Sequence, residues 1–202
     1  MVSPSQSPLD DAALGLVLAV LAGDASAIDR WFRAEHPQVY RLCLGFLADE
    51  AEAEDAAQDA MLHLLDHLAD WDRSRPWRAW RNAVVLNHCR DRLRRTDARR
   101  RAHERSVLER DDGGHGVLPD PGDELARAEV LDVLRATLAA LSPREREAFV
   151  LHDLEGHPTE EAAALLGVTA SSVRSLLTLA RRRLRGLLAE RLPGVCGGGE
   201  HA

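Results

Sequence analysis

The sequence contains no lysine, only three cysteines and few aromatic residues, and it lacks any long apolar segment. No run of about 18 or more apolar residues occurs. The run from Leu14 to Leu21 is too short and too rich in small residues for a membrane span or a secretory signal. The sequence therefore predicts a cytoplasmic protein without membrane insertion.

The cysteines and histidines exclude several kinds of site. Cys43, Cys89 and Cys196 are far apart and odd in number, and they form no CxxC pair or Cys/His cluster, so neither a zinc site nor a disulfide framework is predicted. No catalytic triad, phosphate-binding glycine loop or metal-binding helix can be assembled from the spacing. We expect no catalytic residue, no metal ligand and no cofactor, which makes an enzyme the weakest class. Whether Cys196 senses anything stays open.

Charge is divided unevenly along the chain, although the net charge is −7. Residues 49–72 contain nine acids and no arginine, whereas residues 73–105 contain twelve arginines and three acids. A protein that touches a basic partner with one segment and a polyanion with the next has this pattern. The acidic average therefore does not exclude nucleic acid as a partner.

A charged segment rich in glycine and proline divides the chain. Residues 97–125 have this composition, which is typical of a flexible linker. On both sides of it apolar residues recur at helical spacing, without strand-like alternation. The sequence predicts an all-α protein with two small helical domains, residues 8–96 and residues 126–190, followed by a disordered tail over residues 191–202.

Three helices are predicted in the first domain, beginning near Leu9, near Ser26 and near Ala51. The core of the first two is predicted to include these apolar positions: Leu14, Val17, Leu18, Leu21, Ile28, Trp31 and Phe32. The third helix places four residues on one face, at positions i, i+3, i+4 and i+7: Asp55, Gln58, Asp59 and Leu62. An acidic face ending in an apolar residue suits a basic helix, although a solvated helix exterior has the same pattern.

The segment from Asp70 to Arg95 combines a polar loop, two tryptophans and an arginine-rich helix. Arginine neutralises phosphates, arginine and asparagine read base edges, and an exposed tryptophan offers a surface on which an unstacked base can stack. Trp77 and Trp80 are three residues apart, and they could equally pack together in the core. The group as a whole predicts binding to DNA.

The second domain ends in a predicted helix-turn-helix. Gly167 marks the turn, and Thr169 can cap the helix that follows. The buried stripe of this helix is predicted to be Val173, Leu177, Ala180, Leu184 and Leu187. Its flanks and outer face carry Ser171, Ser172, Arg174, Ser175, Thr178, Arg181 and Arg182. Such a helix would enter the major groove, although a bare interaction domain can share the pattern.

The order of these features resembles the extracytoplasmic-function (ECF) group of sigma-70-type factors, which retain sigma regions 2 and 4. The segment AEAEDAAQDAMLHLLDHL looks like region 2.2, and DWDRSRPWRAWRNAVVLNHCRDRLRR looks like regions 2.3 and 2.4. The segment LSPREREAFVLHDLEGHPTEEAAALLGVTASSVRSLLTLARRRL looks like region 4. The resemblance implies an alternative sigma factor that binds RNA polymerase core, recognises minus-ten and minus-thirty-five promoter elements and assists DNA melting.

The resemblance also implies a role for each candidate surface. The clamp helices of the largest polymerase subunit would meet Asp55, Gln58, Asp59 and Leu62. The flap of the second-largest subunit would meet apolar residues around Leu138, Leu141 and Phe149. Minus-ten DNA would be bound by Trp77, Trp80, Asn82, Asn87, Arg90, Arg92, Arg94 and Arg95, with the loop from Asp70 to Pro76 capturing a flipped base. Minus-thirty-five DNA would be bound by Thr169, Ser171, Ser172, Arg174, Ser175, Arg181 and Arg182.

The last helix departs from the family at three positions. It carries Leu176, Thr178 and Leu179 where the family commonly has Arg, His and Arg, and Leu179 is predicted to point away from the core. This predicts either weak minus-thirty-five affinity or a face that binds protein, such as an anti-sigma factor or the chain's own region 2. Two alternatives therefore stay open: a sigma-factor mimic that sequesters an anti-sigma factor, and a stand-alone helix-turn-helix regulator.

Overall fold

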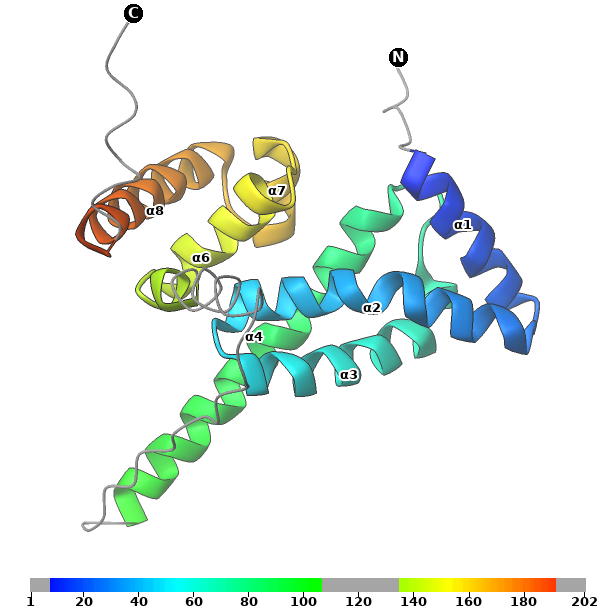
Figure 1. The fold of residues 1–202 in the computed structure, drawn as a ribbon, viewed down its shortest axis with the longest axis horizontal. Coiled ribbons are helices and arrows are strands. Elements are labelled where there is room, and N and C mark those ends of the chain that lie inside the picture. The colour runs from blue at the N-terminus through cyan, green and yellow to red at the C-terminus, as the bar shows by residue number, and fades with distance from the viewer. Residues whose placement is uncertain (1–7, 107–134, 192–202) are drawn as a thin grey trace, which may run out of the picture.

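The computed structural model describes residues 8–106 and 135–191, which form two packed groups of helices (Figure 1). Within these ranges every regular element is a helix, and this confirms the all-α prediction. We call residues 8–106 the first module and residues 135–191 the second module.

The first module contains four α-helices and a short 3-10 turn. Their bounds are α1 (Pro8–Leu21), α2 (Ala25–Leu47), α3 (Glu50–Asp66), η1 (Leu68–Asp70) and α4 (Trp77–Ser106). Side chains that accept from backbone amides start two of these helices: Asp24 caps α2, and Asp49 caps α3. Figure 1 shows α2 and α3 side by side, with α4 crossing them.

The core of the first module includes Trp31, Leu42, Met61 and Leu64. Four residues that the periodicity placed in the core are exposed instead, at 38–40% of their surface: Leu18, Leu21, Ile28 and Phe32. In α1 and at the start of α2, the apolar residues cover more than one side of each helix. The bundle buries only the face that carries Val17 and Trp31.

The second module begins with a helical segment at residues 135–139. It continues with α6 (Pro143–Phe149), the π turn η2 (Val150–Leu154), α7 (Thr159–Leu166) and α8 (Ala170–Arg191). A capping box starts α6: Ser142 accepts from the Glu145 amide, and the Glu145 side chain accepts from the Ser142 amide. Helices α6 and α7 both pack against α8.

The structure corrects the predicted start of the linker. Helix α4 continues through Ser106, so residues 97–106 are helical. This stretch is rich in arginine and alanine, which are good helix formers, and the first glycine of the predicted linker comes later, at Gly113. The rest of the predicted linker and the predicted tail lie outside the described residues, except for Arg191, the last residue of α8.

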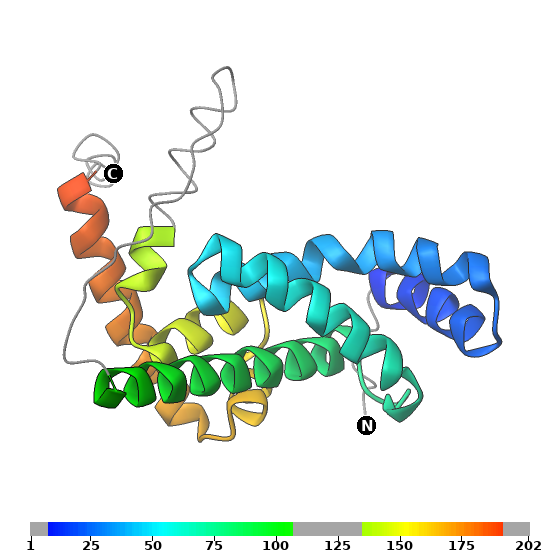
Figure 2. The ribbon, with the colours of Figure 1, turned by 90° about the horizontal axis from the view of Figure 1, so that it is seen from below.

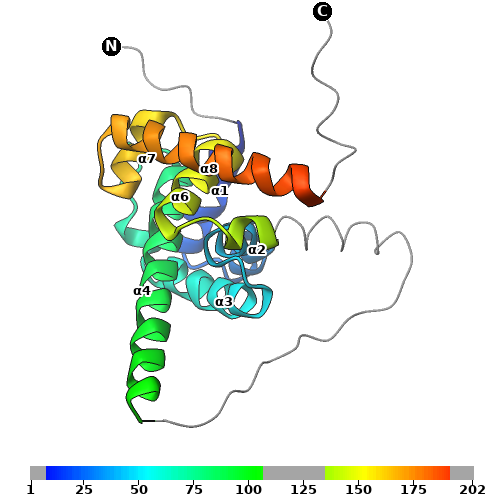
Figure 3. The ribbon, with the colours of Figure 1, turned by 90° about the vertical axis from the view of Figure 1, so that its left-hand side faces the viewer.

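The two modules pack against each other along α2 and α4. One apolar cluster runs through both, joining residues such as Phe46 and Leu86 to Val150 and Leu166. The Val150 side chain packs directly against the backbone of α2 at Gly45, where an added Cβ would lie 3.0 Å from Val150 Cγ2. In Figure 3, α6, α7 and α8 lie near one end of α4, and the other end of α4 extends away from both modules. We call this packing the closed arrangement.

Candidate polymerase and promoter interface

The acidic face of α3 forms as the sequence predicts. Asp55, Gln58, Asp59 and Leu62 are all exposed on one side of the helix, and Leu62 has 60% of its surface in solvent. Asp59 and Asp66 line the same groove as Leu62, so acids flank this exposed apolar side chain. The geometry therefore suits a helix that brings an apolar residue and basic neighbours.

Arg92 of α4 lies against this face rather than free in solvent. Its guanidinium contacts Glu52 Oε2 at 2.6 Å, Asp55 Oδ2 at 3.2 Å and Asp59 Oδ2 at 3.5 Å. The hydrogen bond to Glu52 is the main cause that raises the pKa of Arg92. Arg92, predicted to bind minus-ten DNA, thus joins α4 to the acidic face of α3.

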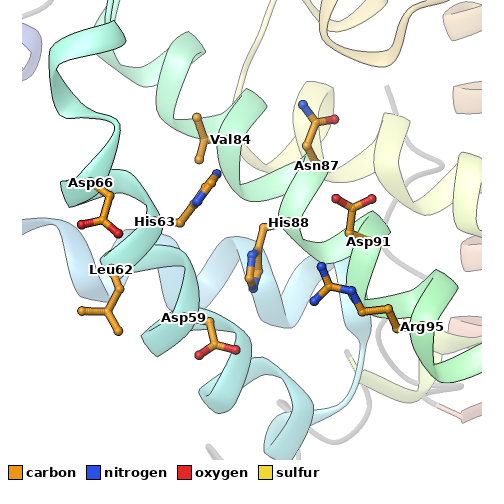
Figure 4. A pocket seen from close by; sticks show the side chains of 9 residues that line it. All are labelled: Asp59, Leu62, His63, Asp66, Val84, Asn87, His88, Asp91 and Arg95. Atoms are coloured by element: carbon orange, nitrogen blue, oxygen red, sulfur yellow. The ribbon is translucent and has the colours of Figure 1, made fainter.

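A groove of about 510 Å³ separates α3 from α4 next to the acidic face (Figure 4). Its lining comes from both helices: Asp59, Leu62, His63, Asp66, Val84, Asn87, His88, Asp91 and Arg95. Burial lowers the pKa of His88, and its Nε2 atom is buried without a hydrogen-bond partner. The groove therefore continues the α3 face, through Asp59 and Leu62, to the exposed side of α4.

All four tryptophans of the chain gather around Trp77. The ring centroids of Trp31, Trp71 and Trp80 lie 6.4, 5.0 and 5.1 Å from that of Trp77. Trp77 is 2% exposed, and its Nε1 donates to Glu35 Oε1 at 2.8 Å. Trp77 therefore follows the core alternative, whereas Trp80 stays half-buried.

The loop before α4 is held by its own hydrogen bonds. The Trp71 indole donates to the Arg75 carbonyl at 3.1 Å, and the Ser74 amide donates to Asp72 at 3.0 Å. The bond from the Ser74 amide is the main cause that lowers the pKa of Asp72. This loop corresponds to the predicted base-capturing segment.

Two predicted minus-ten residues face the second module. Asn82 is fully buried, and its Nδ2 donates to His157 Nε2 at 2.7 Å. Arg90 forms a bidentate pair with Glu147 of α6, at 2.8 and 2.7 Å. In the closed arrangement these side chains are occupied by residues of the second module.

The remaining predicted minus-ten residues lie on the open side of α4. Asn87, Arg94 and Arg95 are exposed. Arg94 pairs with Asp91 one turn earlier, at 2.7 Å, with 73% of its side chain in solvent. These residues can reach a phosphate without any rearrangement of the modules.

The helix-turn-helix has the predicted local geometry. Gly167 ends α7 in the left-handed region, with φ 67°, and Thr169 Oγ1 accepts from the Ser172 amide at 3.1 Å. Val173, Leu177, Ala180 and Leu184 are buried, and Leu187 is half-buried. Thr169, Ser171, Arg174, Ser175, Arg181 and Arg182 are exposed, and Ser172 is half-buried.

Acids of the second module already pair with three arginines of α8, one of which is Arg183, 3.5 Å from Glu145 of α6. Arg181 forms a bidentate pair with Asp153 of η2, at 2.9 and 2.5 Å, and this hydrogen bond is the main cause that raises the pKa of Arg181. Arg174 lies 3.6 Å from Glu160 of α7. Leu179 is 38% exposed, as predicted, whereas Leu176 packs against the core. The outer face of α8 is therefore less positive than its arginine content suggests.

The apolar residues predicted to face the polymerase flap are largely internal. Leu138 and Leu141 are each 2% exposed and pack with Ala180 and Leu184 of α8, and Phe149 packs partly buried against the same cluster. They serve as the core of the second module, so they are not an exposed docking surface in this arrangement.

Among the described residues, no group of three or more His, Cys, Asp or Glu side chains has the geometry to hold a metal ion. None of the described helices alone is both long and apolar enough for a membrane span, although α7 and α8 taken together as a bent pair meet the same criteria of length and composition.

Comparisons with known proteins agree with the order of these surfaces. Residues 31–99 match the model of sigma-70 region 2, and residues 131–184 match that of sigma-70 region 4. The ECF RNA polymerase sigma factor SigM of Mycobacterium tuberculosis is 33% identical over 180 residues, which span 89% of this chain and 86% of SigM.

Two solved structures share the fold. CnrH in complex with the cytosolic domain of CnrY aligns with a TM-score of 0.60 at 26% identity, over 87% of this chain and 96% of CnrH. The sigma factor RpoE of Bartonella quintana, in complex with the anti-sigma factor NepR, aligns with a TM-score of 0.61 at 22% identity, over 79% and 95% of the two chains. With these matches, the chain belongs to the ECF sigma factors of the sigma-70 family.

Sequence reasoning missed the residues that close the modules on each other. Glu147, Glu155 and His157 of the second module all contact the first half of α4. Two pairs within single modules were missed as well: Glu35 with Arg81, and Asp153 with Arg181. Helical periodicity singles out none of them, because each acts through a partner far away in sequence. The sequence did contain one signal of this packing, namely the opposite charges of the arginine-rich helix and of the acids in the second domain.

Proposed function

We propose that this chain is an alternative sigma factor that binds RNA polymerase core and directs transcription initiation at specific promoters. In this proposal the first module acts as region 2 and the second module as region 4. The observation that carries it is the exposed acidic face of α3, with Leu62 60% exposed at its end, next to the arginine-rich α4. Members of the family are transcription initiation factors rather than enzymes, and the protein would act where polymerase and DNA are, in the cytoplasm.

The acidic face is proposed to receive the clamp helices of the largest polymerase subunit. Leu62 would enter an apolar contact, while Asp55 and Asp59 attract basic residues around it. Charges at the rim of such a contact mainly speed association, whereas the central apolar residue carries more of the affinity. We therefore expect Leu62 to contribute more to affinity than any single acid of this face.

Promoter DNA is proposed to contact both modules. The exposed Asn87, Arg94 and Arg95 would meet minus-ten DNA first, with Trp80 available in part for stacking. Asn82 and Arg90 would join them only after the second module leaves α4, because His157 and Glu147 occupy them in the closed arrangement. The start of α8, with Ser171, Arg174 and Ser175, would enter the minus-thirty-five major groove.

A sigma-factor mimic is the second candidate, and the outer face of α8 favours it. Arg181 and Arg174 are paired with acids, and Leu179 is exposed where a DNA-binding helix would gain from a charge. Such a face suits a protein partner, and an anti-sigma factor is the partner that we propose. A stand-alone helix-turn-helix regulator would leave the match of residues 31–99 to region 2 without a role.

In vitro transcription from a genomic fragment library, using purified core polymerase with and without this protein, tests the proposal. We expect new start sites that share two spaced promoter elements. The Leu62→Asp variant should lower core affinity by tenfold or more and remove these start sites, whereas Ile28→Asp, at another exposed apolar position, should leave both unchanged. Core binding without initiation would favour the mimic, and unchanged core affinity in Leu62→Asp would contradict the assigned face.

A further inference from the structure

A buried histidine sits where the second module meets α4. His157, between η2 and α7, is 1% exposed, and both of its ring nitrogens have partners. Nδ1 lies 2.8 Å from Glu161 Oε2 within the second module, and Nε2 lies 2.7 Å from Asn82 Nδ2 of α4. One imidazole therefore joins an acid of its own module to an amide of the other.

The neighbours of the ring define its protonation state. The Glu161 carboxylate can only accept a hydrogen bond, so Nδ1 carries the proton and Nε2 must accept from the Asn82 amide. Asn82 cannot simply turn its amide over, because its Oδ1 accepts from Arg81 Nε at 3.0 Å. A second proton on His157 would therefore set an N–H group of the ring against an N–H group of Asn82.

We propose that the contact between His157 and Asn82 is a proton-sensitive latch, which holds the closed arrangement while His157 is neutral and releases it when His157 is protonated. Protonation would remove the only acceptor that the ring offers to Asn82. It would also place a buried positive charge close to the cations of α4.

Charged groups face His157 from every element packed around it. Arg78 of α4 disfavours a positive ring, whereas Glu161 of α7 and Glu155 after η2 favour it. Arg81 of α4 pairs with Glu155. Glu35 of α2 is paired with Arg81, and His152 of η2 contacts the His157 carbonyl through Nδ1. Burial is the largest influence, and the net effect lowers the pKa of His157 below its ordinary value of 6.5.

This direction determines how acid acts on the closed arrangement. Closing lowers the pKa of His157, so the closed form binds this proton less well than the open form. Neutral His157 therefore stabilises the closed form fully at pH values above the pKa of the open form, and this stabilisation decreases as the pH falls below that pKa. If opening regains an ordinary histidine pKa of about 6.5, release begins near that pH and takes up one proton. The ratio of open to closed molecules then rises by up to about tenfold per pH unit.

An effect of the latch on transcription follows only if the chain has the proposed function. Opening would uncover Asn82 and Arg90 for DNA, so acidification would raise the fraction of protein competent to bind a promoter. The latch itself is a property of the free chain.

The test measures the closed arrangement of the free full-length chain, without polymerase or DNA. Fluorophores at Glu54→Cys on α3 and Arg185→Cys on α8, in a Cys196→Ser background, report the separation of the modules by energy transfer. We expect transfer to fall between pH 7.5 and pH 5 in the otherwise unaltered protein. His157→Gln can still accept from Asn82 but does not titrate, so its transfer should stay high throughout, and His36→Gln, away from the module contact, should behave like the parent.

Asn82→Asp supplies a test of sign that does not depend on how well His157→Gln packs. An aspartate at this position would accept from a protonated ring and repel Glu155 at high pH, so this variant should close as the pH falls. The proposal is overturned if the parent shows no transition, if His157→Gln opens with the parental pH profile, or if Asn82→Asp opens on acidification. Failure of transcription would leave all of these readouts intact, so the two proposals can fail separately.

Discussion

Arginine residues have different surroundings in the two halves of α4. In the first half Arg90 has 16% of its side chain exposed and pairs with Glu147 of the second module, whereas in the second half Arg94 has 73% exposed. In Figure 2, α4 runs alongside elements of both modules. Its first half pairs with residues of the second module, such as Glu147 and His157, whereas its second half extends beyond both modules (Figure 1). The position of the second module, rather than the number of arginines, therefore decides which part of the helix can meet DNA.

The largest change in the exposure of the first half of α4 is expected when a larger side chain at Gly45 pushes the second module away. A Cβ added there would lie 3.0 Å from Val150 Cγ2, and overpacking of this kind costs about 1–3 kcal/mol. We expect Gly45→Leu to open the closed arrangement and expose the first half of α4. Energy transfer between the fluorophores on α3 and α8 measures the opening.

Gly15→Leu on α1 is the matched control, because nothing lies within 4 Å of a Cβ added at that helical glycine. It should keep the modules closed and leave the stability equal or slightly higher, since leucine is the better helix former. Parental transfer in Gly45→Leu would show that the close approach to Val150 does not hold the modules together.

The second half of α4 can be tested through its salt dependence. Replacing Arg94 and Arg95 together by alanine should weaken promoter binding by the polymerase complex. A plot of log affinity against log salt concentration has a negative slope, which becomes shallower by about 0.9 for each phosphate contact that is lost. Loss of both arginines should therefore make it shallower by about two. Binding titrations at several salt concentrations check this, with Arg33→Ala on α2 as the control. An unchanged slope would mean that the exposed half of α4 does not meet phosphates.

The smallest effect is expected on α8, where Asp153 holds Arg181. Asp153→Asn removes the negative charge and should free Arg181 for a phosphate, which would steepen the salt slope by up to about one and raise minus-thirty-five affinity a few-fold. Asp29→Asn, which removes the acid of a more exposed pair with Arg33 on α2, is the control. Weaker DNA binding in Asp153→Asn would instead mean that Asp153 positions Arg181 for DNA.

Local patterns in the sequence predicted the faces of α3 and α8 well. Helical periodicity predicts the buried stripe of α8 around Val173 and Leu177, and it predicts the exposed face of α3 from Asp55 to Leu62. Thr169 caps α8, as its residue type suggests. Each of these features depends on residues within a few turns of one another.

Features that depend on distant partners could not be predicted in the same way. Periodicity could not show that Trp77 becomes the centre of a tryptophan cluster, or that Ile28 and Phe32 face solvent, because that depends on which helices cover α2. The pairs of Arg90 with Glu147 and of Asn82 with His157 join residues 57 and 75 positions apart. Nothing in either local sequence specifies the other.

Arg146 constrains how the contact between the modules can change during evolution. Its guanidinium donates to the carbonyls of Phe46 and Leu47 at the end of α2, at 3.2 and 3.0 Å, and to that of Leu141, so it attaches to backbone rather than to side chains. Substitutions along α2 leave those acceptors in place as long as its last turn stays helical. Mutations that loosen this attachment must therefore arise mainly in the second module, and descendants of this protein can vary the surface of α2 while keeping the attachment.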